Sequence, residues 1–386
     1  MTSSASKMSN PAPILLVGLG GAGCSIVGRL APTLPAEVKV ALIDTDATAL
    51  QNLENAEVVQ IGRALTRGMG TGGEPSVGLT ALEADEPQLR RLLTGYPLVV
   101  LVAGLGGGTA GGAAASFATM ATEAGATVLA FATIPFSHEG ERRKRQASDA
   151  LSKLASKAHG LVVVENDLLL MQVPAEAPLS ASFVAADEWV AGSIRALASA
   201  FMPGALVPVD SASVRSILAQ VGSPTLFTCG HGEGVNAAKL AAKAACESSL
   251  SYGLGTTAKV GSLFVHVAGG EKLSATDAFE AVAMVRAKFG GEITTLVGAR
   301  IKPELGDRVE VAVLGASLPP PSKPKVKGKA GKAAKANDEQ QQIFVFATEE
   351  AIRRGLFGST PFTFIDGMDV DVPTYIRKSI RLATAP

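Results

Sequence analysis

The sequence predicts an α/β protein: a parallel sheet, a long central helix, a second smaller α/β domain, a disordered linker and a short tail. Short apolar runs alternate with helical segments, as in a parallel sheet that helices cover on both faces. Glycine-rich loops follow several of these runs, and the composition changes abruptly after residue 318. Apolar residues make up 47% of the chain and aromatic residues only 5%, so the core is expected to consist mainly of Ala, Val, Leu and Ile.

The first part of the chain reads as strand, helix and strand in regular succession. Gly21–Leu30 and Thr109–Gly125 have helical character, and a glycine-rich loop spans residues 66–78. The expected strands are 13–20, 38–46, 56–62, 97–108, 126–136 and 159–167. Because ligands bind beyond the carboxyl ends of parallel strands, the loops at these ends are expected to meet at one sheet edge.

A long helix is expected from 179 to 201, followed by a second set of strands at 223–230, 261–270, 291–299 and 307–317. Helices at 235–249 and 274–288 alternate with these strands, which suggests a smaller mixed sheet. The predicted organisation is a disordered leader (1–12), a first domain (13–178), the central helix (179–202), a second domain (203–316), a Pro-, Lys- and Ala-rich linker (317–342) and a tail (343–386).

The charge balance and the cysteines narrow the class of protein. Thirty-five basic residues balance 35 acidic ones, which gives no electrostatic case for binding nucleic acid. No apolar run reaches the length of a membrane span, and the polar leader does not resemble a signal peptide. Three cysteines without metal-binding spacing are expected to be reduced thiols, so we expect a cytoplasmic protein without direct membrane insertion.

Gly18, Gly20 and Gly23 form a G-x-G-x-x-G pattern between a strand and a helix, and Asp44 closes the next strand. Alone, this pattern is compatible with a dinucleotide site in which Asp44 binds ribose, with a mononucleotide site, or with close packing only. A second loop, "GLGGGTAGG", holds six glycines in nine positions, 104–112. Its free N–H groups and the following helix N-terminus would bind phosphate from a second side, which favours a nucleoside triphosphate.

The motifs "GLGGAG", "DTDATAL" (similar to "NTDA"), "GGGT", "IPFSHEGERR" and "VENDLLL" resemble, in order and spacing, those of the bacterial cell-division GTPase FtsZ and its tubulin relatives. The resemblance covers roughly residues 13–316, and "DVDVPTYIRK" (369–378) resembles the short FtsZ tail peptide. It implies a tubulin/FtsZ-like fold, a GTP or GDP ligand that Mg²⁺ can accompany, and head-to-tail filaments. It also implies that a division-type adaptor binds the tail at Asp369–Lys378.

The resemblance also implies a set of ligand contacts. Glu139 would accept hydrogen bonds from ribose, Arg143 would lie beside the phosphates, and Asn166 and Asp187 would face the guanine base. Phe183, one helical turn before Asp187, could stack on the base or simply pack in the core. The complete set of implied nucleotide-binding residues is Gly20, Gly21, Arg29, Gly104, Gly106, Gly107, Gly108, Thr109, Glu139, Arg143, Asn166, Phe183 and Asp187.

The chain departs from the family pattern in two loops. The phosphate loop usually reads G-G-G-T-G-T-G, but here Ala110 replaces a glycine, which requires a negative φ. In the family, a loop with the pattern N-x-D-x-x-D enters the next subunit's nucleotide site and polarises the attacking water. Here Pro208 replaces the asparagine, Asp210 keeps the first acid and Ser213 replaces the second. A hydroxyl without a partner base is a poor substitute for a carboxylate.

The sequence therefore favours an FtsZ-like, GTP-binding, filament-forming protein with an impaired co-catalytic loop and slow or absent hydrolysis. Asp210 could orient water or only cap the following helix. Three alternatives stay open: an active GTPase that uses Asp210 alone, a nucleotide-free scaffold on the same fold, and an NAD-dependent oxidoreductase, which would leave the second glycine loop unexplained.

Overall fold

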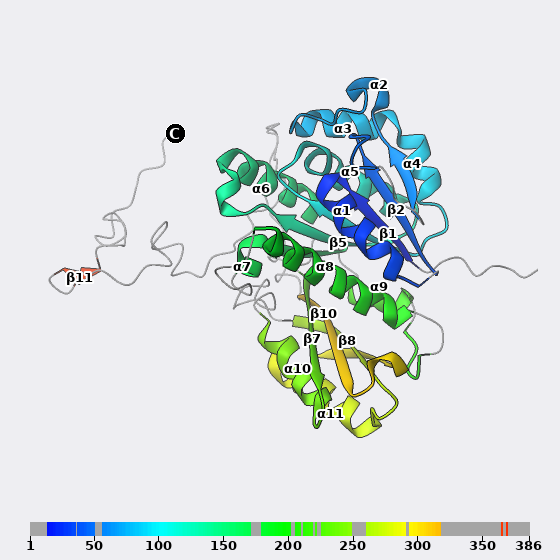
Figure 1. Cartoon of the computed structure of the whole chain (residues 1–386), viewed down its shortest axis with the longest axis vertical. Coiled ribbons are helices and arrows are strands. Elements are labelled where there is room, and N and C mark those ends of the chain that lie inside the picture. Colours follow the sequence, from blue (N-terminus) through cyan, green and yellow to red (C-terminus); the bar gives the residue numbers. More distant parts are fainter. Residues whose placement is uncertain are drawn as a thin grey trace, which may run out of the picture. The chain divides into compact units, whose positions relative to one another are not determined.

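The structure is a computed structural model. It describes residues 14–35, 37–50, 56–170, 179–201, 205–209, 211–218, 221, 225–248, 260–290, 293–317, 364–365 and 368–369. The expected leader, nearly all of the linker and most of the tail lie outside these described residues, as does Asp210. The chain divides into two units, and the first (residues 1–254 and 259–320) contains both larger sheets (Figure 1).

The first sheet is built from six parallel strands in the order β3-β2-β1-β4-β5-β6. Its strands are β1 (Ile14–Leu19), β2 (Val38–Asp44), β3 (Glu57–Gln60), β4 (Leu98–Gly104), β5 (Thr127–Ile134) and β6 (Gly160–Glu165). The central strands β1, β4 and β5 are buried along almost their whole length, because helices cover both faces of a parallel sheet. The predicted α/β class and parallel sheet are confirmed.

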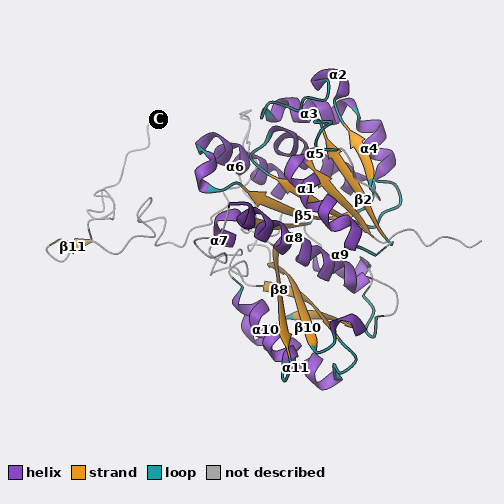
Figure 2. Cartoon of the chain, in the orientation of Figure 1, coloured by secondary structure: helices purple, strands orange, loops and turns teal. Residues whose placement is uncertain are grey.

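Helices connect these strands and surround the sheet (Figure 2). They are α1 (Gly20–Leu30), η1 (Ala31–Thr33), α2 (Arg63–Thr66), α3 (Pro75–Ala84), α4 (Glu86–Leu92), α5 (Gly108–Glu123), η2 (Ser137–Glu139), α6 (Glu141–Ala155) and α7 (Asn166–Leu170). The expected loop at 66–78 is shorter than predicted, because Pro75 opens α3. Proline suits the first turn of a helix, where its missing N–H has no intrahelical partner.

The second sheet is mixed and has the order β7-β10-β8-β9. Strand β10 pairs antiparallel with β7 and β8, whereas β8 and β9 are parallel. The elements after the first sheet are α8 (Leu179–Phe201), α9 (Ser211–Ile217), β7 (Thr225–Glu233), α10 (Ala237–Glu247), β8 (Val260–Gly269), α11 (Ala275–Phe289), β9 (Thr294–Ile301), η4 (Pro303–Leu305) and β10 (Arg308–Ser317). The second unit contributes a short antiparallel pair, β11 (Phe364–Ile365) and β12 (Met368–Asp369).

The faces of β8 explain how α8 joins the two sheets. Leu263, Val265 and Val267 share a core with α10 and α11, whereas Phe264 belongs to the core that contains α8 and the first sheet. This alternation follows from the two-residue period of a strand. Helix α8 therefore contributes Val190, Ile194 and Leu197 to a core that is continuous between the two sheets.

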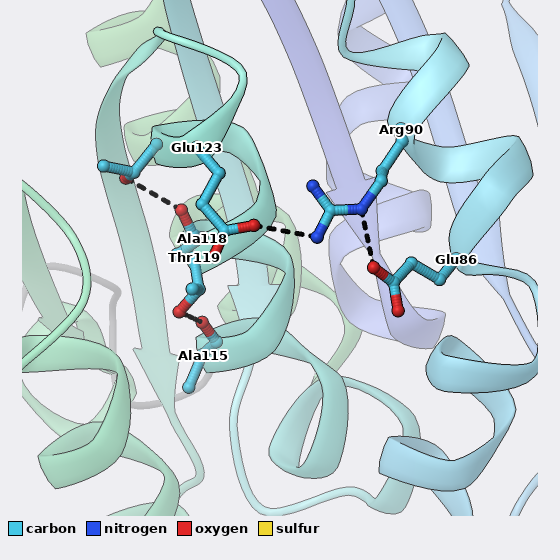
Figure 3. Close-up of polar contacts among 7 residues, drawn as sticks. Glu86, Arg90, Ala115, Ala118, Thr119 and Glu123 are labelled. Carbon is cyan, nitrogen blue, oxygen red and sulfur yellow. Dashed lines mark hydrogen bonds and ion pairs between the residues drawn. The ribbon is translucent and has the colours of Figure 1, made fainter.

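An ion-pair cluster links α4 to the far end of α5 (Figure 3). The guanidinium of Arg90 donates to Glu86 Oε1 at 2.6 Å and to Glu123 Oε2 at 2.8 Å. Within α5, Thr119 donates to the carbonyl of Ala115 at 3.1 Å. Because Arg90 and both carboxylates are exposed, this cluster is worth at most about 1 kcal/mol per pair. The position of α5 therefore depends mainly on its buried residues, which run from Gly108 to Ala121.

Candidate nucleotide-binding site

The β1–α1 turn and the β4–α5 loop contact each other at the carboxyl edge of the first sheet. Gly20 opens α1 with φ +73°, a left-handed conformation that favours glycine. A Cβ at Gly20 would lie 3.1 Å from both the Cβ and the backbone N of Ala110. Ala110 itself lies inside α5 and does not have a positive φ, so the chain meets the condition under which alanine is tolerated there.

Two helix N-termini meet at this contact, and neither has a side-chain cap. Leu19 precedes α1 and Gly107 precedes α5, and neither residue has a side-chain acceptor for the first N–H groups of the helix that follows. The first N–H groups of a helix have no intrahelical partner and carry a partial positive charge. Two such termini side by side form a binding site suited to phosphate.

Asp44 lies at the end of β2 and links this strand end to the start of α5 through hydroxyl groups. Its Oδ1 accepts from Thr109 Oγ1 at 3.0 Å and from the backbone N of Thr45 at 2.7 Å, and the hydroxyls of Thr45 and Thr109 lie 2.8 Å apart. Burial raises the pKa of Asp44, and the hydrogen bond from Thr109 partly opposes that shift. Asp44 is only 3% exposed, which argues against the exposed ribose-binding acid of a dinucleotide site.

The hydroxyl of Thr109 therefore has protein partners. Its backbone N–H, in the first turn of α5, is the group that remains suited to phosphate. Sequence reasoning placed Asp44 at the end of the second strand, as a possible ribose-binding acid, but missed its link to Thr109, which is 65 residues away. No local pattern could have revealed that contact.

The glycine-rich segment before α3 packs against the start of α5. A Cβ at Gly108 would collide with Thr71 Oγ1 and would lie 2.7 Å and 2.8 Å from the backbone N and O of Glu74. Glycine is therefore required at position 108 so that the segment containing Thr71 and Glu74 can approach the start of α5 closely. Gly107 differs, because a Cβ there would meet nothing within 4 Å.

Helix α6 holds this segment from the other side. Arg142 forms an ion pair with Glu74, and Gln146 Nε2 donates to the carbonyl of Gly73 at 3.1 Å. Arg143, the next residue, donates instead to Glu139 Oε2 at 2.5 Å. Sequence reasoning missed Glu74, Arg142 and Gln146, whose contacts join segments about 70 residues apart.

Glu139 and Arg143 are expected ligand contacts that the structure pairs with each other. Glu139 also accepts from the backbone N of Phe136 at 2.8 Å, which fixes the carboxylate at the start of α6. The Arg143 side chain is 59% exposed, so its guanidinium can reach an anion without leaving a buried site. Their roles toward ribose and phosphate stay predictions.

Asn166 begins α7, directly after β6. Its Oδ1 is buried and has no hydrogen-bond partner among the described residues, although buried polar atoms are nearly always paired. An unpaired acceptor is the group expected to receive an N–H from a base. The side chains of Phe183 and Asp187, on α8, lie outside the described residues.

Gly21 and Gly104 lie where the β1–α1 turn meets the β4–α5 loop, which we call the two-loop edge, whereas Arg29 does not. Gly104 ends β4, and a Cβ there would collide with the Cβ of Ala22. Arg29 lies in the last turn of α1, about 13 Å along the helix axis from Gly20 at about 1.5 Å per residue. Its expected contact with the ligand stays a prediction.

The cysteines are structural. Cys24, Cys229 and Cys246 are free thiols, as predicted. Burial, together with the nearby Asp44, raises the pKa of Cys24 to about 12, so its thiol is not a nucleophile near neutral pH. Within the described part of the chain, no helix is long and apolar enough to cross a membrane.

Comparisons with known proteins agree with this geometry. The family model described as "Tubulin/FtsZ family, GTPase domain" matches residues 13–174, and "FtsZ family, C-terminal domain" matches residues 224–318. The chain is 32% identical over 314 residues to cell division protein FtsZ of Buchnera aphidicola subsp. Acyrthosiphon pisum, covering 81% of each chain. It is 31% identical over 344 residues to cell division protein FtsZ of Pseudomonas aeruginosa, covering 87% of this chain and 86% of the relative.

The comparison with solved structures also finds an FtsZ protein. An empty FtsZ dimer of M. jannaschii aligns with a TM-score of 0.72 and 30% identity, over 78% of this chain and 87% of that one. A GTPγS-bound protofilament of CetZ2 from Haloferax volcanii aligns with a TM-score of 0.67 over 78% of this chain and 92% of that one, and at 22% identity it supports the fold alone. The matched domains and the relatives together show that this chain belongs to the FtsZ family of the tubulin/FtsZ superfamily.

Proposed function

We propose that this chain binds GTP and GDP at the two-loop edge, assembles head to tail with further copies, and hydrolyses GTP slowly. The observation that carries the proposal is the pair of uncapped helix N-termini, α1 and α5, in contact at Gly20 and Ala110. The backbone of both loops supplies the phosphate site, so departures in side chains need not abolish binding.

Guanine selection follows from two acceptors at the other end of the ligand. Guanine offers an N1–H and a 2-amino group to one carboxylate, and adenine offers no such pair. Asp187 is proposed to accept both, and the buried Oδ1 of Asn166, which lacks a partner among the described residues, is proposed to accept a further N–H of the base.

Asp187→Ala is expected to weaken GTP binding by about tenfold to a hundredfold, because a hydrogen bond to a charged group is worth about 1.5–3 kcal/mol. The gap between GTP and ATP affinity should narrow at the same time. Competition titrations against a fluorescent guanine nucleotide measure both effects. The matched control is Glu188→Ala, since Glu188 is exposed, adjacent on α8 and paired with Arg195. Equal affinities of the unmodified protein for ATP and GTP would contradict the assignment.

Self-association is proposed to bring the segment before α9 to the phosphate edge of the next copy. Met69 is 77% exposed within the glycine-rich segment before α3, and Leu206 is 67% exposed before α9. Burial of these apolar side chains between successive copies would favour assembly. The solved M. jannaschii FtsZ structure is a dimer.

Slow hydrolysis is proposed from the segment around α9. Pro208 is exposed, and Ser213 lies half-buried in the short helix α9, where the family pattern has an asparagine and a second acid. Asp210, the remaining acid, lies outside the described residues. With one carboxylate missing, water at the neighbouring copy's phosphate would lack part of its general-base positioning.

Ser213→Asp, alone or with Pro208→Asn, is expected to raise phosphate release per assembled subunit by about tenfold or more, since general-base catalysis contributes about 10²–10⁴-fold. The double change matters because proline fixes φ and removes an N–H. Ala212→Asp is the control. Ala212 is exposed, and its substitution adds the same charge one position away on the same helix. Two results together would show that this loop does not limit hydrolysis: rapid GTP hydrolysis by the unmodified protein, and the same rate in Asp210→Ala.

The remaining partners are proposed from the resemblance. The tail peptide Asp369–Lys378 is proposed to bind a division-type adaptor, and the protein is proposed to work in the cytoplasm. No role in binding nucleic acid is proposed, since basic and acidic residues are equal in number.

A further inference from the structure

Asp44 is a buried carboxylate without a cationic partner among the described residues. It is 3% exposed, and its polar contacts are with hydroxyl and backbone N–H groups of residues 45, 46 and 109. A buried charge normally requires a counter-charge, because its removal from water is strongly unfavourable. Thr45, Thr109 and the backbone fix the carboxylate but do not neutralise it.

The two oxygens of Asp44 have different surroundings. Oδ1 accepts from Thr45 N, Thr109 Oγ1 and the backbone N of Asp46 at 2.7, 3.0 and 3.3 Å. Oδ2 accepts no hydrogen bond from the described residues and lies 3.9 Å from the position of a Cβ on Gly21. The hydroxyl of Thr45 is a fourth donor to Oδ1, at 3.4 Å. Because Oδ1 is held by four donors, Oδ2 stays directed toward the first turn of α1, where phosphate is proposed to bind.

An anionic oxygen beside an anionic ligand is repulsive unless a cation lies between them. Carboxylate and phosphate oxygens are the ligands that Mg²⁺ prefers, and Mg²⁺ usually binds through one or two carboxylates, substrate phosphates and water. No group of three or more His, Cys, Asp or Glu gathers within the described ranges, so the protein there offers no complete metal cage. A cation at this place would need the nucleotide's own oxygens.

We propose that Asp44 Oδ2 binds the divalent cation that accompanies the triphosphate, so that metal and nucleotide bind this chain as one linked unit. This inference rests on the proposed nucleotide site. Thr45 and Thr109 act as positioning residues, since their hydroxyls orient the carboxylate. The cation would neutralise both the buried Asp44 and the phosphates, which accounts for a buried acid beside the proposed phosphate site.

The test compares nucleotide affinity with and without metal. Binding of a fluorescent, non-hydrolysable GTP analogue is titrated in Mg²⁺ and in EDTA for the native chain and for Asp44→Asn, which keeps the size and the Oδ1 acceptor. The dissociation constant in EDTA divided by that in Mg²⁺ is expected to be about tenfold to a hundredfold smaller for the variant than for the native chain. Two opposite changes produce this fall: tighter binding in EDTA, because the repulsion is gone, and weaker binding in Mg²⁺.

Asp46→Asn is the matched control. Asp46 is an acid in the same segment whose carboxylate accepts from Thr48 N at 2.8 Å and Thr48 Oγ1 at 2.7 Å, at an exposed position. This variant is expected to keep the native ratio. An unchanged ratio in Asp44→Asn, or an equal gain of affinity in both buffers, would overturn the inference and leave the nucleotide site intact. Absence of guanine-nucleotide binding by the native chain in both buffers would overturn the proposed function as well.

A second measurement does not depend on the variant's folding. Native protein labelled with ¹³C-aspartate is loaded with the GTP analogue and Mn²⁺, and electron–nuclear double resonance is recorded. A strong ¹³C coupling from a directly bound carboxylate is expected. A spectrum with phosphorus coupling but without that ¹³C coupling would show a metal held by the nucleotide alone, and would overturn the inference.

Discussion

Gly108→Ala is expected to lower the free energy of unfolding by about 1–3 kcal/mol or more and to weaken nucleotide binding with it. The added methyl would overlap Thr71 Oγ1 and the backbone of Glu74, and backbone atoms cannot move aside as a flexible side chain can. Overpacking of this kind forces neighbouring segments apart. Because Gly108 opens α5, the displaced segment would shift the helix N-terminus that is proposed to bind phosphate.

Gly107→Ala is the control for the stability measurement. Gly107 has φ −92°, which any residue adopts, and a Cβ there would meet nothing within 4 Å. Urea denaturation is expected to show near-native stability for this variant and a clear loss for Gly108→Ala. If both variants unfolded at the same urea concentration as the native chain, the close packing of residues 71–74 on α5 would be contradicted.

Acid sensitivity is expected to depend on His266, which lies on β8 and faces α8. Burial lowers the pKa of His266 to about 3, and the nearby Lys302 and Arg300 act in the same direction. The imidazole therefore stays neutral in the folded state and takes up a proton on unfolding. Its Nε2 lies 3.3 Å from Ser199 Oγ, and its Nδ1 has no partner in the described part of the chain.

The expected sign follows from this lowered pKa. The contribution of His266 to the free energy of unfolding is fully present above the pKa of the unfolded chain, near 6.5. It is lost as the pH falls toward the folded pKa of about 3. One extra proton bound on unfolding gives a slope of about 1.4 kcal/mol per pH unit within that window.

His266→Leu should remove this contribution to the slope, as measured by urea denaturation between about pH 6.5 and pH 4. Phe264→Leu, on the same strand and stacked near His266, should lower stability without changing the slope. Parallel pH profiles for the native chain and His266→Leu would show that His266 is already protonated when folded.

The sequence predicted most of the fold, because the signals that determine it are local. The apolar runs marked the strands of both sheets, and the helix predicted from 179 to 201 has the observed bounds of α8. The pairing within the second sheet was not predictable, since the antiparallel β10 and the parallel β9 both read as apolar runs. Helix α3 was missed because the glycines before Pro75 dominate the local composition.

The candidate site was predictable only where it consists of backbone. The glycine patterns located both loops, and the meeting of those loops at one edge follows from parallel topology. The contacts that hold the edge together were not predictable. Asp44 to Thr109 and Arg142 to Glu74 join residues 65 and 68 positions apart, and only the folded chain brings them together.

Sedimentation of the purified chain with GTP, GDP or ATP, with phosphate release recorded in the same samples, tests the central claim most directly. We expect pelletable polymer above a critical concentration with GTP alone, and phosphate release that lags well behind assembly. A chain that stays monomeric with GTP at high concentration and in crowded buffer, or that assembles equally with ATP, would contradict the account.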